Sequence, residues 1–386
     1  MTSPPTSITI VGAGSAGLRL AQRLASNGLP VTVYEDHPEI GIPEHCSGLI
    51  SARNTQALGF DLRDSFTNDI YGAKIFSPNH TQLRIERKKP VAHVMDRSLF
   101  DKTLYRQALE AGANIELNTS VMNVKGNTIF TQSKGKGGMK KSNIIVAADG
   151  VNSRLRKIAG IESHPTDFIH SYQVKAAGHF DPRFVELYLG DKFAPSFFAW
   201  VIPENEESAK VGIGCKMGVN PVHAFNAFLK EKQINIHVKE SNSFLIPCAP
   251  PIRKLVSDPI LLLGDAAYQT KGTTGGGIIM NCKSADILGD VIKEHVMEGA
   301  SLDEYPRRME PIFKELELHY KIHQYQSRLS DGQVDKLFLK LKDAGVEQFL
   351  SEEGDMDEPT QFIGKLLSNP RIISFLPEAI SFAMTK

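Results

Sequence analysis

The feature that most constrains the fold is a glycine-rich turn between a short apolar strand and a helix near the start of the chain. Residues 8–11 (Ile-Thr-Ile-Val) predict a buried strand, and residues 18–24 carry the apolar spacing of a helix, which is stopped by Asn27-Gly28. The turn and the first helical residues hold Gly12, Gly14 and Gly17 in the spacing G-x-G-x-x-G. A second strand follows, so the chain begins with a βαβ unit. We therefore predict an α/β fold with a Rossmann-like first domain.

The same unit predicts a dinucleotide site. In this motif the first glycine permits a tight turn, the second lets a pyrophosphate approach the backbone, and the third lets the helix pack on the strand. A helix N-terminus favours an anion, so Ala16 in the first turn is a candidate contact. The second strand, residues 31–34, ends at Glu35, whose carboxylate is placed to bind the ribose of an adenosine.

Two later segments favour FAD over NAD as the dinucleotide. Residues 259–263 predict another buried strand, followed by Asp265 and by glycines that lead to a helix starting near Gly277 and Ile278. An aspartate there is suited to bind ribityl hydroxyls, and the helix dipole suits the pyrimidine edge of a flavin. A third buried strand, residues 144–148, runs into Asp-Gly. The set in this order resembles FAD enzymes of the glutathione-reductase-like superfamily, in the branch that includes aromatic hydroxylases.

Three further segments narrow this resemblance. They are residues 43–48 (Pro-Glu-His-Cys-Ser-Gly), 96–101 (Asp-Arg-Ser-Leu-Phe-Asp) and 195–203 (Pro-Ser-Phe-Phe-Ala-Trp-Val-Ile-Pro). With them the chain, from residue 8 to about 296, is similar to the geranylgeranyl reductase family, in particular to its archaeal digeranylgeranylglycerophospholipid reductases. The resemblance implies that the loop with Cys46 lines the flavin, that Arg97 contacts FAD, and that the aromatic segment lines an isoprenoid channel.

Phe198 and Trp200 are the candidate substrate-binding residues. Alternation along a strand sends both rings to one face, and Trp200 is the single tryptophan of the chain. Such a face belongs either to a long apolar pocket or to an ordinary core, where aromatic rings usually lie. The resemblance favours the pocket. The chain departs from the family pattern at Phe198 (family Tyr), Ile202 (family Phe) and Gly272 (Pro in many members), which leaves the exact prenyl substrate open.

Cys46 is the candidate catalytic residue. Free thiols carry their proton at neutral pH, so a thiol beside the flavin is suited to deliver a proton to an alkene. The alternative is a small buried apolar residue, and the neighbouring His45 is most simply a polar loop residue. The candidate FAD contacts are Gly12, Gly14, Ala16, Gly17, Glu35, Cys46, Ser47, Arg97, Val121, Asp265, Gly277 and Ile278.

Length and pattern predict more than one domain in the 386 residues. We assign residues 1–164, joined by 255–300, to a discontinuous FAD-binding domain, and 165–254 to an inserted substrate domain with an antiparallel sheet. Residues from about 60 to 90 fit either domain, and residues 301–386 form a helical C-terminal region. Within the first domain, a Gly- and Lys-rich stretch at 134–141 predicts a solvated hairpin turn.

Composition excludes several classes of protein. The chain has 44 basic and 44 acidic residues, a balance that argues against nucleic-acid binding. Its four cysteines are scattered without a C-x-x-C pair, so we expect no metal site and no disulfide framework. Neither a secretion signal nor a bilayer-length apolar stretch is visible, and we expect a cytoplasmic enzyme.

The leading hypothesis is an FAD-dependent oxidoreductase that saturates C=C bonds of geranylgeranyl chains in archaeal membrane-lipid precursors. Such a substrate implies peripheral association with a membrane. A second nucleotide-binding unit is not apparent, which favours an external electron donor such as ferredoxin or transiently bound NAD(P)H. The alternative is a flavin-dependent monooxygenase or halogenase of the same superfamily. An electron-transfer flavoprotein–quinone oxidoreductase would need cluster-binding cysteines, and no feature supports a non-catalytic flavin-binding protein.

Overall fold

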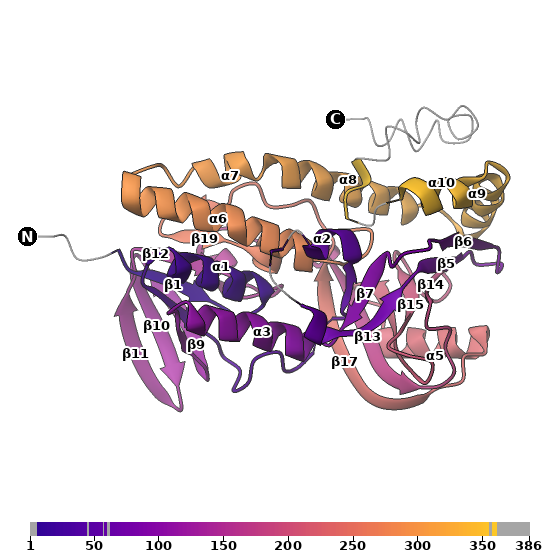
Figure 1. The fold of residues 1–386 in the computed structure, drawn as a ribbon, viewed down its shortest axis with the longest axis horizontal. Helices are drawn as coiled ribbons and strands as arrows, with labels where there is room; N and C mark the ends of the chain where they lie inside the picture. Colours follow the sequence, from indigo (N-terminus) through magenta and orange to yellow (C-terminus); the bar gives the residue numbers. More distant parts are fainter. Residues whose placement is uncertain (1–5, 45, 57, 60–61, 355–356, 361–386) are drawn as a thin grey trace, which may run out of the picture.

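Two large sheets, one at each end of an elongated molecule, organise the chain (Figure 1). The structure is a computed structural model that describes residues 6–44, 46–56, 58–59, 62–354 and 357–360. Figure 1 shows helices α6, α7 and α8 running along one long side of the molecule, and α9 and α10 continuing over the second sheet.

The first sheet has six strands in the order β18-β19-β12-β1-β2-β8, all parallel except for the β18–β19 pair. Every residue of β1 and β12 is buried, as expected for β-branched strands covered on both faces. This arrangement confirms the predicted Rossmann-like α/β fold. The strands are β1 (Ile8–Val11), β2 (Val31–Tyr34), β8 (Asn114–Glu116), β12 (Ile144–Ala147), β18 (Val256–Ser257) and β19 (Ile260–Leu262).

Three helices cover the first sheet. Helix α1 (Ser15–Ser26) packs against both α3 (Arg97–Glu110) and α6 (Ile278–Glu298). Arg19 of α1 donates to Asp286 of α6 at 2.7 Å, so the helices that follow the two glycine-rich turns are joined. The Asp96 side chain accepts from the Leu99 N–H and caps the start of helix α3. The short α4 (Arg154–Ile158) follows β12.

An antiparallel meander lies beside this domain, and one expectation about it is wrong. It consists of β9 (Thr119–Lys125), β10 (Thr128–Ser133) and β11 (Lys136–Lys141). The stretch 134–141 is not a turn: only Lys134 and Gly135 form the connection, and the rest pairs with β10 as an edge strand. All six side chains of β11 are exposed. Solvated lysines are compatible with an edge strand, and composition alone did not distinguish it from a loop.

The second sheet has seven strands in the order β17-β13-β16-β15-β14-β5-β6. Neighbours are antiparallel except for β14 and β5, which are parallel, so the expected antiparallel sheet is slightly mixed. Strands β5 and β6 come from residues 72–86. The strands are β5 (Gly72–Phe76), β6 (Gln82–Glu86), β13 (Phe168–Ala177), β14 (Phe184–Leu189), β15 (Phe198–Pro203), β16 (Ser208–Lys216) and β17 (His237–Pro247).

The two faces of the seven-stranded sheet bury separate cores. One face packs on helix α5 (Pro221–Lys232) through residues such as Val211 and Phe228. The other face holds Phe198 and Trp200 and packs on a small sheet of order β3-β7-β4 through Ile70 and other residues. The small sheet consists of β3 (Leu49–Ser51), β4 (Phe66–Ile70) and β7 (Ala92–Met95).

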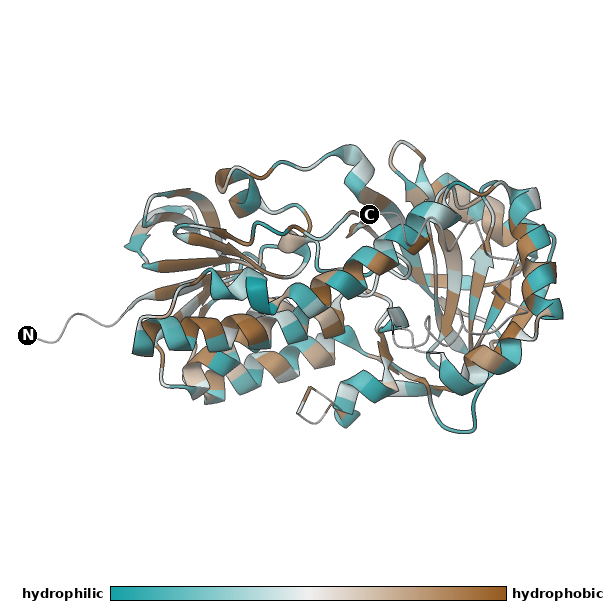
Figure 2. Cartoon of the chain, turned by 90° about the horizontal axis from the view of Figure 1, so that it is seen from above, coloured by the Kyte–Doolittle hydropathy of each residue, from teal (hydrophilic) through white to brown (hydrophobic). Residues whose placement is uncertain are grey.

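The remaining helices complete the long side of the molecule. They are α2 (Ala52–Gln56), α7 (Glu304–Arg308), α8 (Glu310–Gln326), α9 (Asp331–Asp343) and α10 (Val346–Glu353), with 3-10 turns at η1 (Arg63–Ser65), η2 (Pro165–Asp167) and η3 (Gly264–Ala267). Figure 2 shows teal and brown segments mixed along the outer helices, as expected where one face is buried. Among the described helices, none is both long enough and apolar enough to cross a bilayer. The apolar segments around Phe375 and Phe382 lie outside the described residues.

Candidate active site

The three glycines of the first turn differ in what surrounds them. Gly12 has φ +102°, and a Cβ there would lie 2.2 Å from the carbonyl oxygen of Ala148. A Cβ at Gly17 would lie 2.1 Å from the carbonyl oxygen of Gly12, so helix and turn touch through backbone. At Gly14, in contrast, a Cβ would meet no atom within 4 Å. The turn is therefore closely packed on both sides of one open position, which is the space a pyrophosphate needs.

The start of helix α1 also suits an anion. Gly14 is its N-cap and offers no side chain to the first turn, which contains no acidic residue. The first N–H groups of a helix have no partner within the helix, and its dipole is positive at this end. Ala16 lies in this first turn, 3.1 Å from the position of a Cβ at Gly264. The glycine turn after β1 and the loop after β19 are thus neighbours in space.

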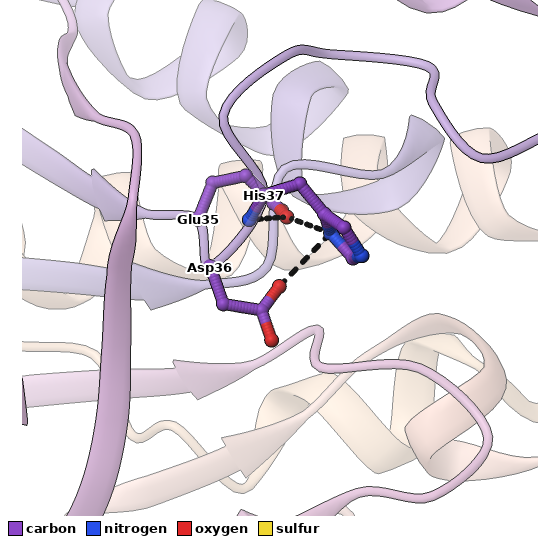
Figure 3. A group of neighbouring side chains, drawn as sticks. All are labelled: Glu35, Asp36 and His37. Carbon is purple, nitrogen blue, oxygen red and sulfur yellow. Dashed lines mark hydrogen bonds and ion pairs between the residues drawn. The ribbon is translucent and has the colours of Figure 1, made fainter.

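Glu35 lies at the end of β2 and ties the strand to the glycine turn. Its carboxylate accepts from the backbone N–H of Ala13 at 2.7 Å and from that of His37 at 3.0 Å, and the His37 ring nitrogen lies at 2.6 Å (Figure 3). Burial opposes ionisation, but these hydrogen bonds outweigh it and lower the pKa of Glu35. The site holds a carboxylate oriented beside the turn.

Asp36 completes a small acidic group with these residues, at 2.9 Å from the same His37 nitrogen (Figure 3). One ligand atom from each of Glu35, Asp36 and His37 lies within 4.8 Å of the others. Asp36 and His37 are exposed, and hydrogen bonding within the group accounts for the arrangement. We assign no metal to it.

The loop after β19 and the start of α6 hold the second group of residues predicted to contact FAD. Asp265 accepts from the Thr270 hydroxyl at 2.9 Å and from the Asn281 amide at 3.2 Å. The other amide atom of that side chain, Asn281 Oδ1, is buried without a partner among the described residues. Gly277 is the N-cap of α6 and offers no side chain, and Ile278 is its first residue. A buried acceptor and an uncapped helix start both face the region predicted for the flavin.

Arg97 and Cys46 meet at the start of α3. The Arg97 guanidinium donates to both oxygens of Asp101 at 3.0 Å, and the Cys46 thiol interacts with the same guanidinium. Burial opposes the positive charge, yet Asp101 and Cys46 outweigh it and raise the pKa of Arg97 further above its ordinary value. Its Nε is buried and has no partner among the described residues. A permanent cation therefore lies beside the one cysteine that is not fully buried.

The Cys46 loop, which we define as residues 41–44 and 46–48, is held by side chains of the second sheet. Gln173 of β13 donates to the carbonyl oxygen of Cys46 at 3.3 Å, and Asn242 of β17 donates to that of Glu44 at 3.1 Å. The ammonium of Lys210 on β16 forms an ion pair with the Glu44 carboxylate, and Lys210 is only 2% exposed. The loop thus connects the nucleotide-facing parts of the first domain with the second sheet.

Phe198 and Trp200 share a face of β15, as the alternation predicted. Their ring centroids are 5.8 Å apart, and both are buried, at 8% and 5% exposure. The indole lies flat across β16, because a Cβ at Gly212 would come within 2.4 Å of it. Its Nε1–H donates to Gln173 Oε1 at 3.0 Å. In this structure the two rings belong to a packed apolar cluster, and their contact with a lipid chain stays a prediction.

The remaining candidate contacts of FAD lie in different environments. Ser47 lies in the Cys46 loop and is half-buried, whereas Val121 is buried on β9 within the core of the first domain. His45 lies outside the described residues. Four residues of the site were not expected from the sequence: Gln173, Lys210, Asn242 and Asn281. For Asn281 a signal existed, since it is a polar residue in an otherwise apolar first helical turn.

These observations fit a bound dinucleotide. Gly14 leaves room for phosphates, two helix starts lack side-chain caps, and Arg97 Nε and Asn281 Oδ1 are buried polar atoms without partners among the described residues. Buried polar atoms normally have partners, so such exceptions point to a ligand or ordered water. The Rossmann-like sheet and its first turn therefore form a dinucleotide-binding domain.

Comparison with known proteins agrees with this description. Residues 10–86 match the model of an NAD(P)-binding Rossmann-like domain, and residues 167–244 match that of a geranylgeranyl reductase catalytic domain. A protein named digeranylgeranylglycerophospholipid reductase 2, from Methanothermobacter thermautotrophicus, is 31% identical over 357 residues. That alignment covers 87% of this chain and 91% of the relative.

Solved structures share the fold over most of the chain. A geranylgeranyl bacteriochlorophyll reductase-like protein from Thermoplasma acidophilum superposes with a TM-score of 0.85 at 22% identity, covering 97% of this chain and all of that one. The flavin-dependent halogenase CmlS superposes with a TM-score of 0.66 at 16% identity, covering 88% of this chain and 70% of that one. At these identities the likeness establishes the fold.

Proposed function

This chain belongs to the geranylgeranyl reductase family, and from that premise we propose that it is an FAD-dependent oxidoreductase that saturates C=C bonds of geranylgeranyl chains in membrane-lipid precursors. One observation carries the proposal beyond the family match. Cys46 lies between Arg97, at the nucleotide-facing part of the first domain, and Gln173, which bonds the aromatic face of the second sheet. A proton carrier thus lies where a cofactor and an apolar chain would meet.

Different residues suit the different parts of an FAD molecule. The open position at Gly14 and the start of α1 suit the pyrophosphate, and Glu35 suits the adenosine ribose. Asp265, with Asn281 beside it, suits the ribityl chain, and the start of α6 at Gly277 and Ile278 suits the pyrimidine edge of the flavin. When bound and reduced, FAD supplies the hydride for the reaction.

The residues of this chain supply the proton and the positioning. An isolated alkene has no carbonyl to polarise it, so the substrate must be held in close contact with the cofactor and away from water. In this proposal the prenyl chain packs against the face with Phe198 and Trp200, which belongs to a buried apolar cluster, and water is excluded there. Cys46 holds a proton at Sγ and gives it to the alkene carbon that does not receive the hydride, and Arg97 keeps the thiol in place.

We further propose that the substrate lipid is taken up at a membrane surface and that an external donor, ferredoxin or NAD(P)H, reduces the cofactor. Flotation of the purified protein with anionic lipid vesicles tests the membrane contact. Anaerobic mixing with each donor and observation of flavin bleaching identifies the donor.

The decisive test of the function is a half-reaction without oxygen. Purified protein is reconstituted with FAD, reduced with dithionite under anaerobic conditions, and mixed with a digeranylgeranylglycerol phospholipid in micelles. We expect reoxidation of the flavin and a lipid product heavier by two hydrogens per double bond reduced. A flavin that stays reduced until oxygen is added, with a hydroxylated or halogenated product, would overturn the proposal in favour of a monooxygenase or halogenase.

A further inference from the structure

Among the residues that the structure describes, Gln173 is the one amide with hydrogen bonds to both the aromatic face and the Cys46 loop. Its Oε1 accepts from Trp200 Nε1–H at 3.0 Å, and its Nε2 donates to the carbonyl oxygen of Cys46 at 3.3 Å. Gln173 is 6% exposed, so neither bond competes freely with water. Buried bonds of this kind are costly to leave unmade. A displacement of the Trp200 indole therefore moves the Gln173 amide, which in turn moves the backbone of Cys46.

We propose that Gln173 is a positioning residue that couples occupancy of the Trp200 face to the position of Cys46. The inference deepens the proposed function, on which its reference to a prenyl chain rests. An amide suits this position, because it offers an acceptor to the indole and a donor to the carbonyl at once. A carboxylate would keep the first bond and repel the carbonyl, and an aliphatic side chain would make neither.

The surroundings of Trp200 restrict where the ring can move. On one side lies the backbone of β16, since a Cβ at Gly212 would already be 2.4 Å from the indole. On the same face the Phe198 ring lies 5.8 Å away, packed on Phe197 at 4.2 Å. A chain that enters this cluster must displace rings that are now in contact with one another. The hydrogen bond at Nε1 transmits such a shift to Gln173 and from there to Cys46.

The opposite end of the connection is held on several sides. Asn242 fixes the carbonyl of Glu44, and Lys210 pairs with the Glu44 carboxylate, so the loop is anchored next to Cys46 independently of Trp200. Cys46 itself interacts with Arg97. Movement at the Gln173 bond is therefore confined to the Cys46 residue. Asn242 of β17, which lies opposite Gln173, offers a matched comparison, because its amide bonds to the same loop without a hydrogen bond to the indole among the described residues.

Alkylation of Cys46 by iodoacetamide provides a readout that does not depend on turnover. The other three cysteines are buried, at 4% exposure for Cys248 and 0% for Cys215 and Cys282, so Cys46 reacts first. The rate is measured by mass spectrometry on oxidised, FAD-loaded protein, for wild type, Gln173→Leu, Trp200→Phe and the double variant. Trp200→Phe keeps a ring but removes the donor. Asn242→Leu is measured alone and with Trp200→Phe.

We expect Gln173→Leu and Trp200→Phe each to change the alkylation rate by about three- to tenfold, the scale of one lost hydrogen bond. The double variant should change it no more than the larger single change, because both remove the same connection. Asn242→Leu and Trp200→Phe should instead combine by multiplication. Multiplicative effects of Gln173→Leu and Trp200→Phe, or no effect of Gln173→Leu, would overturn the proposal.

Two further measurements keep the test decisive. If Gln173→Leu does not fold, Gln173→Glu replaces it: it should change alkylation while leaving the emission of the single tryptophan near that of wild type. Addition of geranylgeraniol should alter alkylation in wild type but not in either Gln173 variant; an equal response in all would overturn the coupling. Non-additivity in a protein that reduces no lipid would refute the proposed function and leave the coupling standing.

Discussion

The glycine turn after β1 and the Cys46 loop after β2 face the same expected cofactor but are held in different ways. The turn is packed by backbone: Gly12 against Ala148 of the neighbouring strand, and Gly17 against Gly12 itself. The Cys46 loop is held by side chains from another sheet, with Gln173 and Lys210 lying 127 and 166 positions from their partners. The contacts of the turn are made by backbone atoms and do not depend on particular side chains, whereas those of the Cys46 loop do.

Because the two regions are held differently, we expect substitutions in them to have different consequences. The backbone-packed turn has no room for a further atom at Gly12 or Gly17. An added methyl group at either position should therefore abolish the fold or the cofactor site. A loop held by several separate side chains should instead lose its geometry in steps, with the fold intact. The predictions that follow compare the two regions in order of decreasing effect.

The largest effect is expected at Gly12. Alanine there would meet the Ala148 carbonyl at 2.2 Å in a backbone conformation that L residues rarely adopt, so we expect Gly12→Ala to lose more than about 4 kcal/mol of unfolding free energy or to yield insoluble protein. Gly14→Ala is the matched control: it has open space around it and should stay within about 1 kcal/mol of wild type while binding FAD weakly. Denaturant unfolding measures the stability of the two variants, and the flavin content of the purified proteins measures FAD binding. Equal stability of the two variants would refute the packing argument.

His323 of α8, beside the aromatic cluster of the second sheet, should make the folded protein sensitive to acid. It lies against Phe197, with ring centroids 6.0 Å apart, and burial lowers its pKa from 6.5 to about 4. Between these values the unfolded chain binds a proton that the folded chain does not, so stability falls as the pH decreases from 6.5 towards 4, by roughly 3 kcal/mol at most. His323→Leu should remove this slope from the pH dependence of denaturant unfolding. An unchanged slope would show that His323 does not titrate in this way.

The third effect is catalytic and is confined to the Cys46 loop. Cys46→Ser should slow alkene-dependent reoxidation of reduced flavin by about 10²-fold, the low end for loss of a general acid, while flavin reduction stays nearly unchanged. Stopped-flow single-turnover measurements separate the two half-reactions. Comparable reoxidation rates in wild type and variant would exclude Cys46 as the proton donor.

The smallest effect is expected at Glu35. Glu35→Gln keeps the size of the side chain but loses charge-assisted bonds, and FAD affinity should fall by about tenfold. Because its folded pKa is lowered, Glu35 contributes stability that is fully present above its ordinary value near 4.5 and is lost as the pH falls through the lowered pKa. Glu35→Gln should lack this loss. Flavin titrations test the first point, and unfolding below about pH 4, outside the window of His323, tests the second.

The difference between the two regions also explains which parts of the fold and of the site could be predicted from the sequence. The Rossmann-like fold followed from residues 8–35, because a strand, a glycine turn and a helix are determined by neighbours in the chain. Composition predicted a turn at residues 134–141, but β11, with its exposed lysines, is an edge strand. Gln173 and Lys210 could not be identified, because a polar residue inside a strand pattern acquires its role from a partner more than a hundred positions away. The charge of Lys210 is visible in sequence, but its burial is not.

The most direct measurement is a crystal structure of the protein with FAD bound. The account predicts that the adenosine ribose lies within hydrogen-bonding distance of Glu35 and the pyrophosphate at Gly14. It also predicts the isoalloxazine ring within about 4 Å of Cys46 Sγ and near the start of α6 at Gly277. A flavin ring bound away from the Cys46 loop, with the adenosine in place, would contradict the claim that the two regions serve one cofactor.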